Sequence, residues 1–240
     1  TVRNAFHHHF DYIDKYYTPF IPAAKRMNAK IKRDIDPVNN DGITLIPQAM
    51  SIVADEVIDL HRQLVPYGYD EINVNLGCPS GTVVSKKRGS GILAYPDMLD
   101  SFLDELYTKA DFPVSIKTRV GFNDDELWPK LIEIYSKYPI SELTVHPRVQ
   151  KDFYKNTPRM DDFALAMQKI NPDKTILCYN GDITNANSFK ALTDRFPDID
   201  EIMIGRGLFA NPALIAELKG ISMDKAELCE RLKNWHDEIL

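Results

Sequence analysis

Short apolar runs alternate with longer amphipathic stretches along the 240 residues of the chain, and this alternation limits the possible folds more than any other feature. The apolar runs lie at residues 15–21, 42–48, 71–77, 113–119, 141–148, 175–181 and 200–207. Stretches with helical spacing lie between most of them, at residues 51–65, 96–109, 125–138, 159–170 and 185–196. Near-continuous apolar strands that alternate with helices are typical of βα units around a buried parallel sheet.

Polar residues gather where these predicted strands end, and their distribution bears on the kind of sheet. They are Gln48, Asn75, Cys78, Lys117, Arg119, His146, Arg148, Asn180, Asp182, Gly205 and Arg206. A parallel βα barrel builds its active site from successive strand ends, whereas a doubly wound open sheet concentrates such residues at one crevice. We therefore predict a (β/α)8 TIM barrel whose first strand precedes Thr1. The open sheet is the main alternative, because strand counting does not exclude it.

Composition excludes several classes of protein. The 44% hydrophobic and 27% charged content is ordinary for a soluble globular protein, and no apolar run approaches the roughly 18 residues that span a bilayer. We expect a cytoplasmic monomer without a membrane segment. The three cysteines (Cys78, Cys178 and Cys229) are widely spaced and odd in number, which argues against a disulfide framework and against a CxxC metal site. The net charge of −6 gives no global support for nucleic-acid binding, although a local basic patch can still bind phosphates.

The two ends of the chain have helical features. Residues 219–240 place Leu228, Leu232 and Trp235 on one face of a helix, so we expect residues 1–218 to form the barrel and 219–240 to begin a C-terminal helical region. Near the other end, the sequence "AFHHHFDY" contains three consecutive histidines. Side chains of consecutive helical residues point about 100° apart, so these three cannot face one metal ion, and a surface or capping role is expected.

Lys117 and the pair His146 and Arg148 are candidates for binding a charged ligand. Lys117 interrupts an apolar strand, and a lysine in such a position is rare unless it is paired or functional. It either extends to solvent or holds its charge against a ring that becomes anionic when reduced. His146 and Arg148 are two residues apart, so they face the same side of their strand. A hydrogen-bonded structural role is the alternative for His146.

The segments "YNGDI" and "IGRGLFANP" follow the last two predicted strands. In many barrels these two loops bind phosphate through backbone N–H groups and the start of a short helix. Glycine lets the backbone approach an anion closely, and Arg206 can add charge-assisted hydrogen bonds. No GxGxxG segment precedes a helix, which favours FMN over FAD as the phosphate-bearing ligand.

Taken together, these motifs resemble the tRNA-dihydrouridine synthase family, which are FMN-dependent barrel enzymes. The matching stretches are "IPQ", "INVNLGCPS…RGSGIL", "SIKTRVGF", "LTVHPR", "YNGDI" and "MIGRGLFANP", between about residues 44 and 215. The resemblance implies that NADPH reduces a bound FMN, which then delivers hydride to C6 of a uridine in tRNA. It assigns FMN binding to Gln48, Lys117, His146, Asn180, Gly181, Asp182, Gly205 and Arg206. Cys78 would protonate C5, and Asn75 would place the uracil.

Two departures from the family pattern stand out. The family's first strand, with a Pro-Met pair that contacts the flavin, has no counterpart here, and its C-terminal helical domain corresponds at most to residues 219–240.

The basic segment after Cys78 is expected to contact RNA. A base stacked in folded RNA must be extruded before it can react, and the glycines at 77, 81, 89 and 91 would let the following loop cover it. A thiol is mostly protonated at neutral pH and can donate a proton. Phosphate contacts are expected from Lys86, Lys87, Arg88, Arg148 and Lys151. A dihydroorotate-dehydrogenase-like enzyme acting on a free pyrimidine, and a barrel that binds RNA without catalysis, are the alternative functions.

Overall fold

The computed structural model describes residues 1–22 and 26–240. Its strands are β1 (Tyr16–Tyr17), β2 (Ile21–Pro22), β3 (Leu45–Ile46), β4 (Gln48–Met50), β5 (Ile72–Leu76), β6 (Val114–Gly121), β7 (Glu142–Val149), β8 (Ile176–Tyr179) and β9 (Glu201–Ile202). Its α-helices are α1 (Val2–His9), α2 (Ala29–Ile35), α3 (Ala54–Leu64), α4 (Gly81–Val84), α5 (Pro96–Lys109), α6 (Trp128–Tyr135), α7 (Met160–Lys169), α8 (Ala186–Arg195), α9 (Arg206–Ala210), α10 (Leu214–Leu218) and α11 (Lys225–Ile239).

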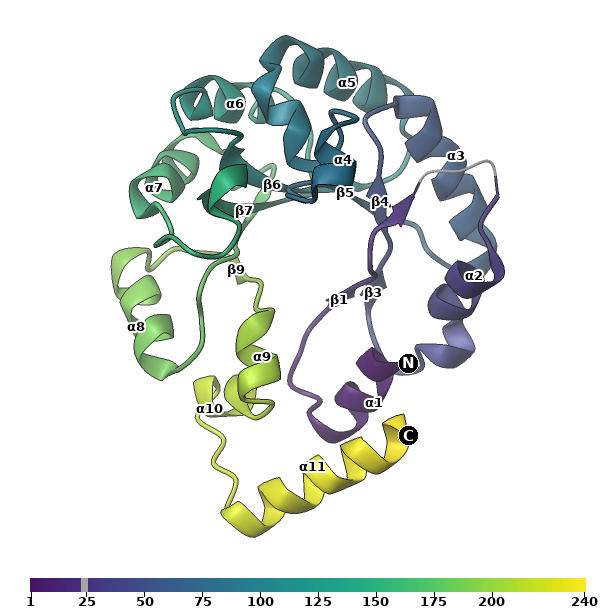
Figure 1. Ribbon diagram of the computed structural model, residues 1–240, viewed down its shortest axis with the longest axis vertical. Helices are drawn as coiled ribbons and strands as arrows, with labels where there is room; N and C mark the ends of the chain where they lie inside the picture. The colour runs from purple at the N-terminus through teal and green to yellow at the C-terminus, as the bar shows by residue number, and fades with distance from the viewer. Residues whose placement is uncertain (23–25) are drawn as a thin grey trace.

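The main sheet has seven strands in the order β2-β4-β5-β6-β7-β8-β9, and every pairing is parallel. The order follows the chain without a reversal, which is the order of a βα barrel and not that of a doubly wound sheet. In Figure 1 the strands line the inside of an arc, and helices α2, α3, α5, α6, α7 and α8 lie outside it. The predicted TIM-barrel class is confirmed. Within the described residues β2 and β9 pair on one side only, so the arc is open between them.

Prolines interrupt the first two strands that were predicted from the sequence. Pro19 lies between β1 and β2, and Pro47 lies between β3 and β4. Proline lacks the N–H that a ladder requires, so each ladder breaks there. The N–H of Thr18 donates to the carbonyl of Ile46 at 3.1 Å and links the β1–β3 and β2–β4 ladders. Strands β1 and β2 therefore correspond to the predicted run 15–21, and β3 and β4 correspond to the predicted run 42–48, with β2 and β4 ending slightly beyond these runs.

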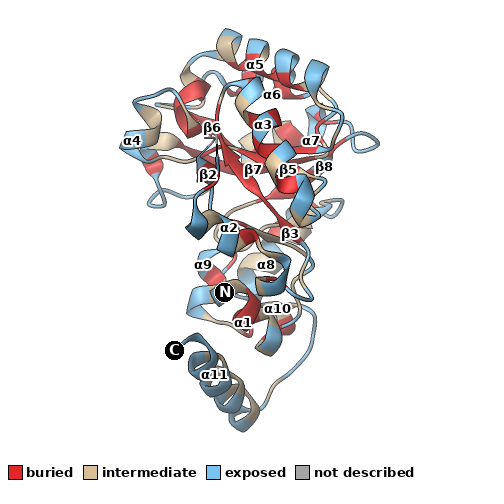
Figure 2. Ribbon diagram, turned by 90° about the vertical axis from the view of Figure 1, so that its right-hand side faces the viewer, coloured by how far each residue is buried: buried red, intermediate tan, exposed pale blue. Residues whose placement is uncertain are grey.

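The core lies between the sheet and its outer helices. All eight residues of β7 are buried, as are all residues of β6 except Lys117, because parallel strands are covered on both faces. Helix α5 supplies Leu99, Phe102 and Leu103 to this core. Figure 2 shows the buried strands at the centre and the mostly exposed α11 at one end. The predicted helical stretches all contain a helix whose bounds lie within them.

Helix α11 packs against α1 at the open side of the arc, where the two ends of the chain lie close together (Figure 1). The Trp235 ring meets Phe6 and Phe10 edge-on, with centroids 5.5 and 6.2 Å apart. His8 and His9 both contact the Glu238 carboxylate, at 2.8 and 2.9 Å. Two of the three consecutive histidines thus hold the two terminal helices together. The predicted domain boundary between residues 218 and 219 stays a prediction. Among the described residues no helix is both long and apolar enough to cross a bilayer.

Candidate active site

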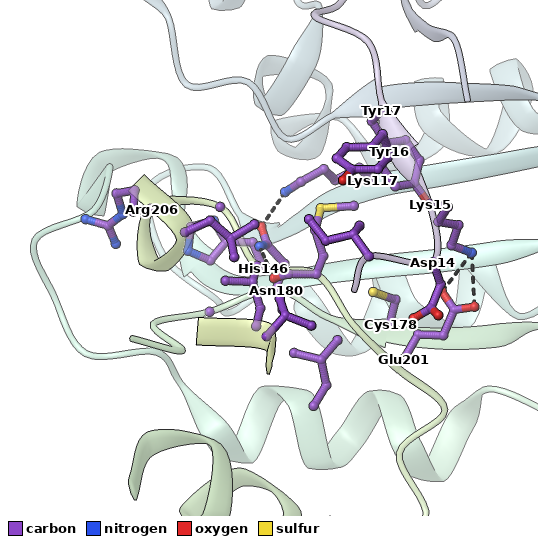
Figure 3. A pocket seen from close by; sticks show the side chains of 18 of the residues that line it. Asp14, Lys15, Tyr16, Tyr17, Lys117, His146, Cys178, Asn180, Glu201 and Arg206 are labelled. Carbon is purple, nitrogen blue, oxygen red and sulfur yellow. Dashed lines mark hydrogen bonds and ion pairs between the residues drawn. The ribbon is translucent and has the colours of Figure 1, made fainter. Parts of the chain in front are cut away.

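A cavity of about 1350 Å³ lies inside the barrel and reaches the carboxyl ends of the strands. Every residue that the sequence assigned to FMN or to the reaction lines it. We call these residues the rim cluster: Gln48, Asn75, Cys78, Lys117, His146, Asn180, Gly181, Asp182, Gly205 and Arg206. Figure 3 shows Lys117, His146 and Asn180 in the middle of the cavity wall and Arg206 at one end. The parallel strand order explains this convergence, because the carboxyl ends of all strands meet at one side of a barrel.

A chain of amides fixes the end of β5 and with it the backbone of Cys78. The Oδ1 atom of Asn75 accepts the N–H groups of Gly77 and Cys78, at 3.0 and 2.9 Å. The Nδ2 atom of Asn75 donates to Gln48 at 2.6 Å, and Gln48 in turn donates to the buried Asn73 at 2.8 Å. Asn75 therefore acts on the position of Cys78 through the backbone, and its contact with a base stays a prediction.

Lys117 points into the cavity as an uncompensated cation. Its Nζ atom donates to Oδ1 of Asn180 at 2.6 Å, and Nδ2 of Asn180 donates to the Met203 carbonyl at 2.9 Å. Burial, together with the charge of Arg119, lowers the pKa of Lys117 to about 8. Across residues 1–22 and 26–240, no carboxylate forms an ion pair with Lys117. A cation held in this way favours an anionic ligand.

His146 is a neutral hydrogen-bonding group. Burial lowers its pKa to about 2, and the charges of Lys117, Arg119, Arg148 and Arg206 contribute to the shift. Its Nε2 atom accepts a hydrogen bond from Arg148 at 3.1 Å, which assigns the imidazole proton to Nδ1. The imidazole therefore stays uncharged at physiological pH.

Arg148 is buried in the barrel wall, and this placement corrects the expectation that it meets RNA phosphate from a rim loop. It is 1% exposed and forms ion pairs to Asp182 through both terminal nitrogens. Its Nε atom donates to the carbonyl of Asn156. The guanidinium is thus satisfied inside the protein, and its charge faces Asp182 rather than solvent.

The basic segment after Cys78 also differs from the expected loop. Residues 81–94 contain α4 and the 3-10 helix η3 (Gly89–Ala94), joined by a turn, and Gly89 and Gly91 are buried. A Cβ atom at Gly89 would lie 2.7 Å from the Cys78 carbonyl oxygen, so this glycine permits close packing under Cys78. Arg88 forms an ion pair with Glu56 at 3.0 Å and is not free to bind phosphate in this arrangement. Lys86 and Lys87 are exposed, and their contact with phosphate stays a prediction.

Comparison with known proteins gives the family. The amino-acid sequence matches the model of the dihydrouridine synthases over residues 4–237. This chain belongs to the dihydrouridine synthase family. Among its relatives, tRNA-dihydrouridine synthase B of Pasteurella multocida (strain Pm70) is 30% identical over 168 residues, which are 70% of this chain and 49% of that protein. A probable tRNA-dihydrouridine synthase of Staphylococcus aureus (strain Mu50 / ATCC 700699) is 33% identical over 154 residues, which are 62% of this chain and 46% of that protein.

The chain therefore spans about half the length of the curated relatives it matches. Among solved structures, N-acetylneuraminate lyase from Mycoplasma synoviae is similar with a TM-score of 0.48 and 16% identity, over 99% of this chain and 74% of the lyase. This similarity is too low to support an argument. The barrel assignment rests on the dihydrouridine synthase family and on the strand order.

Two further residues that line this cavity, Arg119 and Tyr154, received no role from the sequence. Arg119 is buried and donates to the carbonyls of Gly77, Val149 and Phe153, at 2.9, 3.0 and 2.9 Å. It ties the backbone before Cys78 to the segment that carries Tyr154. The Tyr154 ring lies over the cavity, half exposed, 6.1 Å from the His146 ring and 4.6 Å from the guanidinium of Arg206. An aromatic residue eight positions after His146 gives no periodic signal, so only the fold reveals it.

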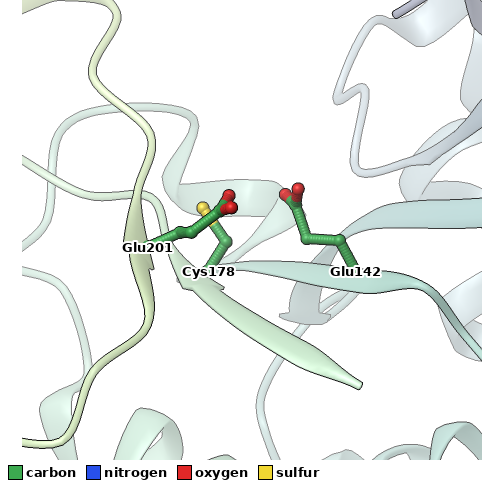
Figure 4. A group of neighbouring side chains, drawn as sticks. All are labelled: Glu142, Cys178 and Glu201. Carbon is green, nitrogen blue, oxygen red and sulfur yellow. The ribbon is translucent and has the colours of Figure 1, made fainter. Parts of the chain in front are cut away.

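A second polar group, which the sequence did not predict, lies at the amino ends of the strands. We call it the base cluster: Lys15, Tyr17, Glu142, Cys178 and Glu201. The carboxylates of Glu142 and Glu201 face each other beside the Cys178 thiol (Figure 4). The Nζ atom of Lys15 lies 2.5 Å from Glu142 and 2.7 Å from Glu201.

Lys15 supplies the positive charge that these carboxylates need. Burial opposes the charge on Lys15, but its hydrogen bonds to Glu142 and Glu201 raise its pKa above the usual range. Burial also opposes the charge on Glu142, yet the hydrogen bonds from Lys15 and Thr144 hold its pKa below the usual value. The base cluster is therefore an internal ion-pair network.

Proposed function

We propose that this chain is the catalytic part of a cytoplasmic, monomeric tRNA-dihydrouridine synthase. It would use NADPH and FMN to reduce the C5–C6 bond of specific uridines in tRNA to 5,6-dihydrouridine. The observation that carries this proposal is the position of Cys78, held by Asn75 at the end of β5 and lining one cavity with Lys117 and Asn180. The family match and the names of the two relatives support it. Residues 219–240 would begin the region that helps to bind tRNA.

The residues of the rim cluster fit FMN. Lys117 and Arg206 provide positive charge, and Gly205 borders open space, since no atom lies within 4 Å of the Cβ position there. Gly181 and Gly207 are needed for packing, because a Cβ atom would lie 2.0 Å from the Tyr179 hydroxyl or 2.2 Å from the Ile183 carbonyl oxygen. Bound FMN would supply the hydride. Lys117 would hold its charge beside the electron-rich side of the flavin.

Cys78 would hold a proton close to C5 of the uracil ring. Reduction at C6 leaves negative charge on C5 and O4, and a nearby acid completes the reaction by protonating C5. Asn75 and Arg119 would position Cys78, because both bind the backbone that immediately precedes it. Tyr154 would stack against the extruded base, since an exposed aromatic ring over a cavity suits a flat, unstacked nucleobase.

The test uses the full-length protein and two substrates. Purified protein should be yellow and should release FMN on denaturation. With NADPH it should form dihydrouridine in tRNA that lacks this modification, and it should leave orotate unchanged. Turnover of orotate without turnover of tRNA would support the dihydroorotate-dehydrogenase-like alternative. Protein that binds tRNA but no flavin would contradict an enzymatic role.

A further inference from the structure

Asp182 lies between two arginines at the end of the cavity where the predicted phosphate loops meet. Its Oδ1 atom accepts from Arg148 at 3.2 Å and from Arg206 at 2.5 Å, and its Oδ2 atom accepts a second hydrogen bond from Arg148. The three charged groups sum to one positive charge. A phosphate group offers the same geometry of oxygens to guanidinium groups as a carboxylate, with more negative charge.

The two arginines differ in their freedom to change partner. Arg148 is 1% exposed and is also bound to the carbonyl of Asn156 and to His146. Arg206 has a side chain that is 56% exposed, and its further contact is the face of Tyr154 at 4.6 Å. In Figure 3 Arg206 extends at the edge of the cavity, away from His146 and Asn180. Arg206 can therefore leave Asp182 at small cost, whereas Arg148 cannot.

We propose that the Asp182 carboxylate is an internal stand-in for the phosphate of the flavin. Without a phosphate it pairs with both Arg148 and Arg206 and offsets one of their two positive charges. When a phosphate monoester enters, Arg206 transfers to the phosphate and Asp182 stays on Arg148. This inference rests on the proposed FMN site, and within that site it makes Asp182 a competitor of the phosphate for Arg206 instead of an FMN ligand.

The Asp182 carboxylate increases the stability of the protein without ligand but lowers its affinity for phosphate. It stabilises the ligand-free site, because breaking a buried ion pair by removing one partner is costly. It also weakens phosphate binding, because the carboxylate repels the dianion and competes for Arg206. Asp182→Asn keeps the size of the side chain and one acceptor oxygen but removes the charge. The variant should lose thermal stability without ligand and bind phosphate more tightly.

The experiment compares ligands with and without phosphate on flavin-stripped protein. Fluorescence titration should give about tenfold tighter FMN binding for Asp182→Asn than for the wild type. The variant removes the repulsion between the carboxylate and the phosphate, and a charge interaction strong enough to shift a pKa by one changes a binding constant by about a factor of ten. Riboflavin, which lacks the phosphate, should bind both proteins equally. The melting temperature should rise more with inorganic phosphate in the variant than in the wild type. Asp161→Asn, which removes an exposed carboxylate paired with Arg195, is the matched control and should change none of these values.

Unchanged or weaker FMN binding in Asp182→Asn would overturn the proposal. If that variant does not fold, Arg206→Gln decides: it should weaken FMN binding about tenfold and leave riboflavin binding unchanged, and equal effects on both ligands would be contrary evidence. Failure of the wild type to bind any flavin would contradict the proposed function instead. In that case the melting temperatures of Asp182→Asn and of the wild type, each measured with and without inorganic phosphate, still test the role of Asp182. An equal rise in both proteins would overturn the proposal.

Discussion

The rim cluster and the base cluster lie at the two ends of one cavity, yet they balance their charges in different ways. Around His146 the cations Lys117, Arg119, Arg148 and Arg206 outnumber the nearby carboxylates, since Asp182 pairs with two of them and Asp152 is already paired with Arg159. In the base cluster Lys15 lies between two carboxylates, and hydroxyl groups of Tyr17 and Thr144 complete the hydrogen bonding of Glu142. One end has spare positive charge. At the other end Lys15 pairs with both carboxylates, and burial together with the charge of Glu142 raises the pKa of Glu201, which lessens the negative charge there.

This difference teaches how to separate a binding site from a structural network inside one barrel. Buried charges are costly unless they are paired, so a surplus of one sign indicates a ligand of the opposite sign. Lys15 joins the segment before β1 to β7 and β9, and thus connects the two sides of the open arc. We expect substitutions in the rim cluster to impair function and substitutions in the base cluster to impair folding.

The largest effect is expected for Cys78, with Cys178 in the same cavity as its control. Cys78→Ala should slow tRNA-dependent reoxidation of the reduced flavin by about 10²–10⁴-fold, the usual contribution of general acid catalysis. Binding of FMN and its reduction by NADPH should remain near normal. Rapid mixing of reduced enzyme with tRNA measures the step, at matched flavin occupancy.

Cys178→Ala is the matched control, because Cys178 lines the same cavity but belongs to the base cluster. Burial raises the pKa of the Cys178 thiol well above its usual range, so it is a poor proton donor. This variant should reoxidise at the wild-type rate. Equal loss of rate in both variants would remove the distinction between the two clusters.

The second prediction concerns the ion pairs of Lys15. Lys15→Met leaves the buried carboxylate of Glu142 without its cation and should lower the free energy of unfolding by about 3 kcal/mol. The affinity for FMN should not change in the folded protein. Urea denaturation measures the loss, and the double variant Lys15→Met/Glu142→Gln should recover part of it. A large loss of FMN affinity with intact stability would place Lys15 in the binding site instead.

Lys117→Met should show the reverse of the Lys15→Met result: FMN binding should be about tenfold weaker, and the free energy of unfolding should change little. The pKa of Lys117 is about 8 in the folded protein, below the 10.5 of an exposed lysine, so the unfolded chain binds more protons between these values. The stability of the ligand-free protein should therefore rise as the pH increases from about 8 to about 10.5. Denaturation at pH 7.5 and at pH 10 should show this rise in the wild type and a smaller one in Lys117→Met. Identical pH dependence in both proteins would contradict the buried, charged lysine.

The sequence predicted that the residues of the rim cluster lie together, because the signal for this is local. Each residue lies within the second half of an apolar run or just after it, and a parallel barrel necessarily brings those run ends together. The base cluster depends on Lys15 meeting partners that are 127 and 186 residues away, and no periodic pattern encodes such a contact. The pairing of Arg88 with Glu56 was missed for the same reason. The extra strand breaks at Pro19 and Pro47, by contrast, follow from the missing N–H of proline and were open to prediction.

The smallest effect is expected from the exposed lysines after Cys78. Lys86 and Lys87 are solvent-exposed, and Lys87 lies over the ring of Tyr95 at 4.4 Å, whereas the adjacent Arg88 is bound to Glu56. Removal of a phosphate contact lowers the slope of log affinity against log salt by about one. The variant Lys86→Ala/Lys87→Ala should therefore reduce the slope for tRNA binding by about two, with a loss of affinity of a few fold at physiological salt. Arg88→Gln is the matched control, and it should cost some stability but keep the wild-type slope. If Arg88→Gln lowers the slope as much as the lysine variant does, Arg88 must leave Glu56 and bind an RNA phosphate. An ion pair in the free protein would then not distinguish structural charges from RNA-binding charges in this segment.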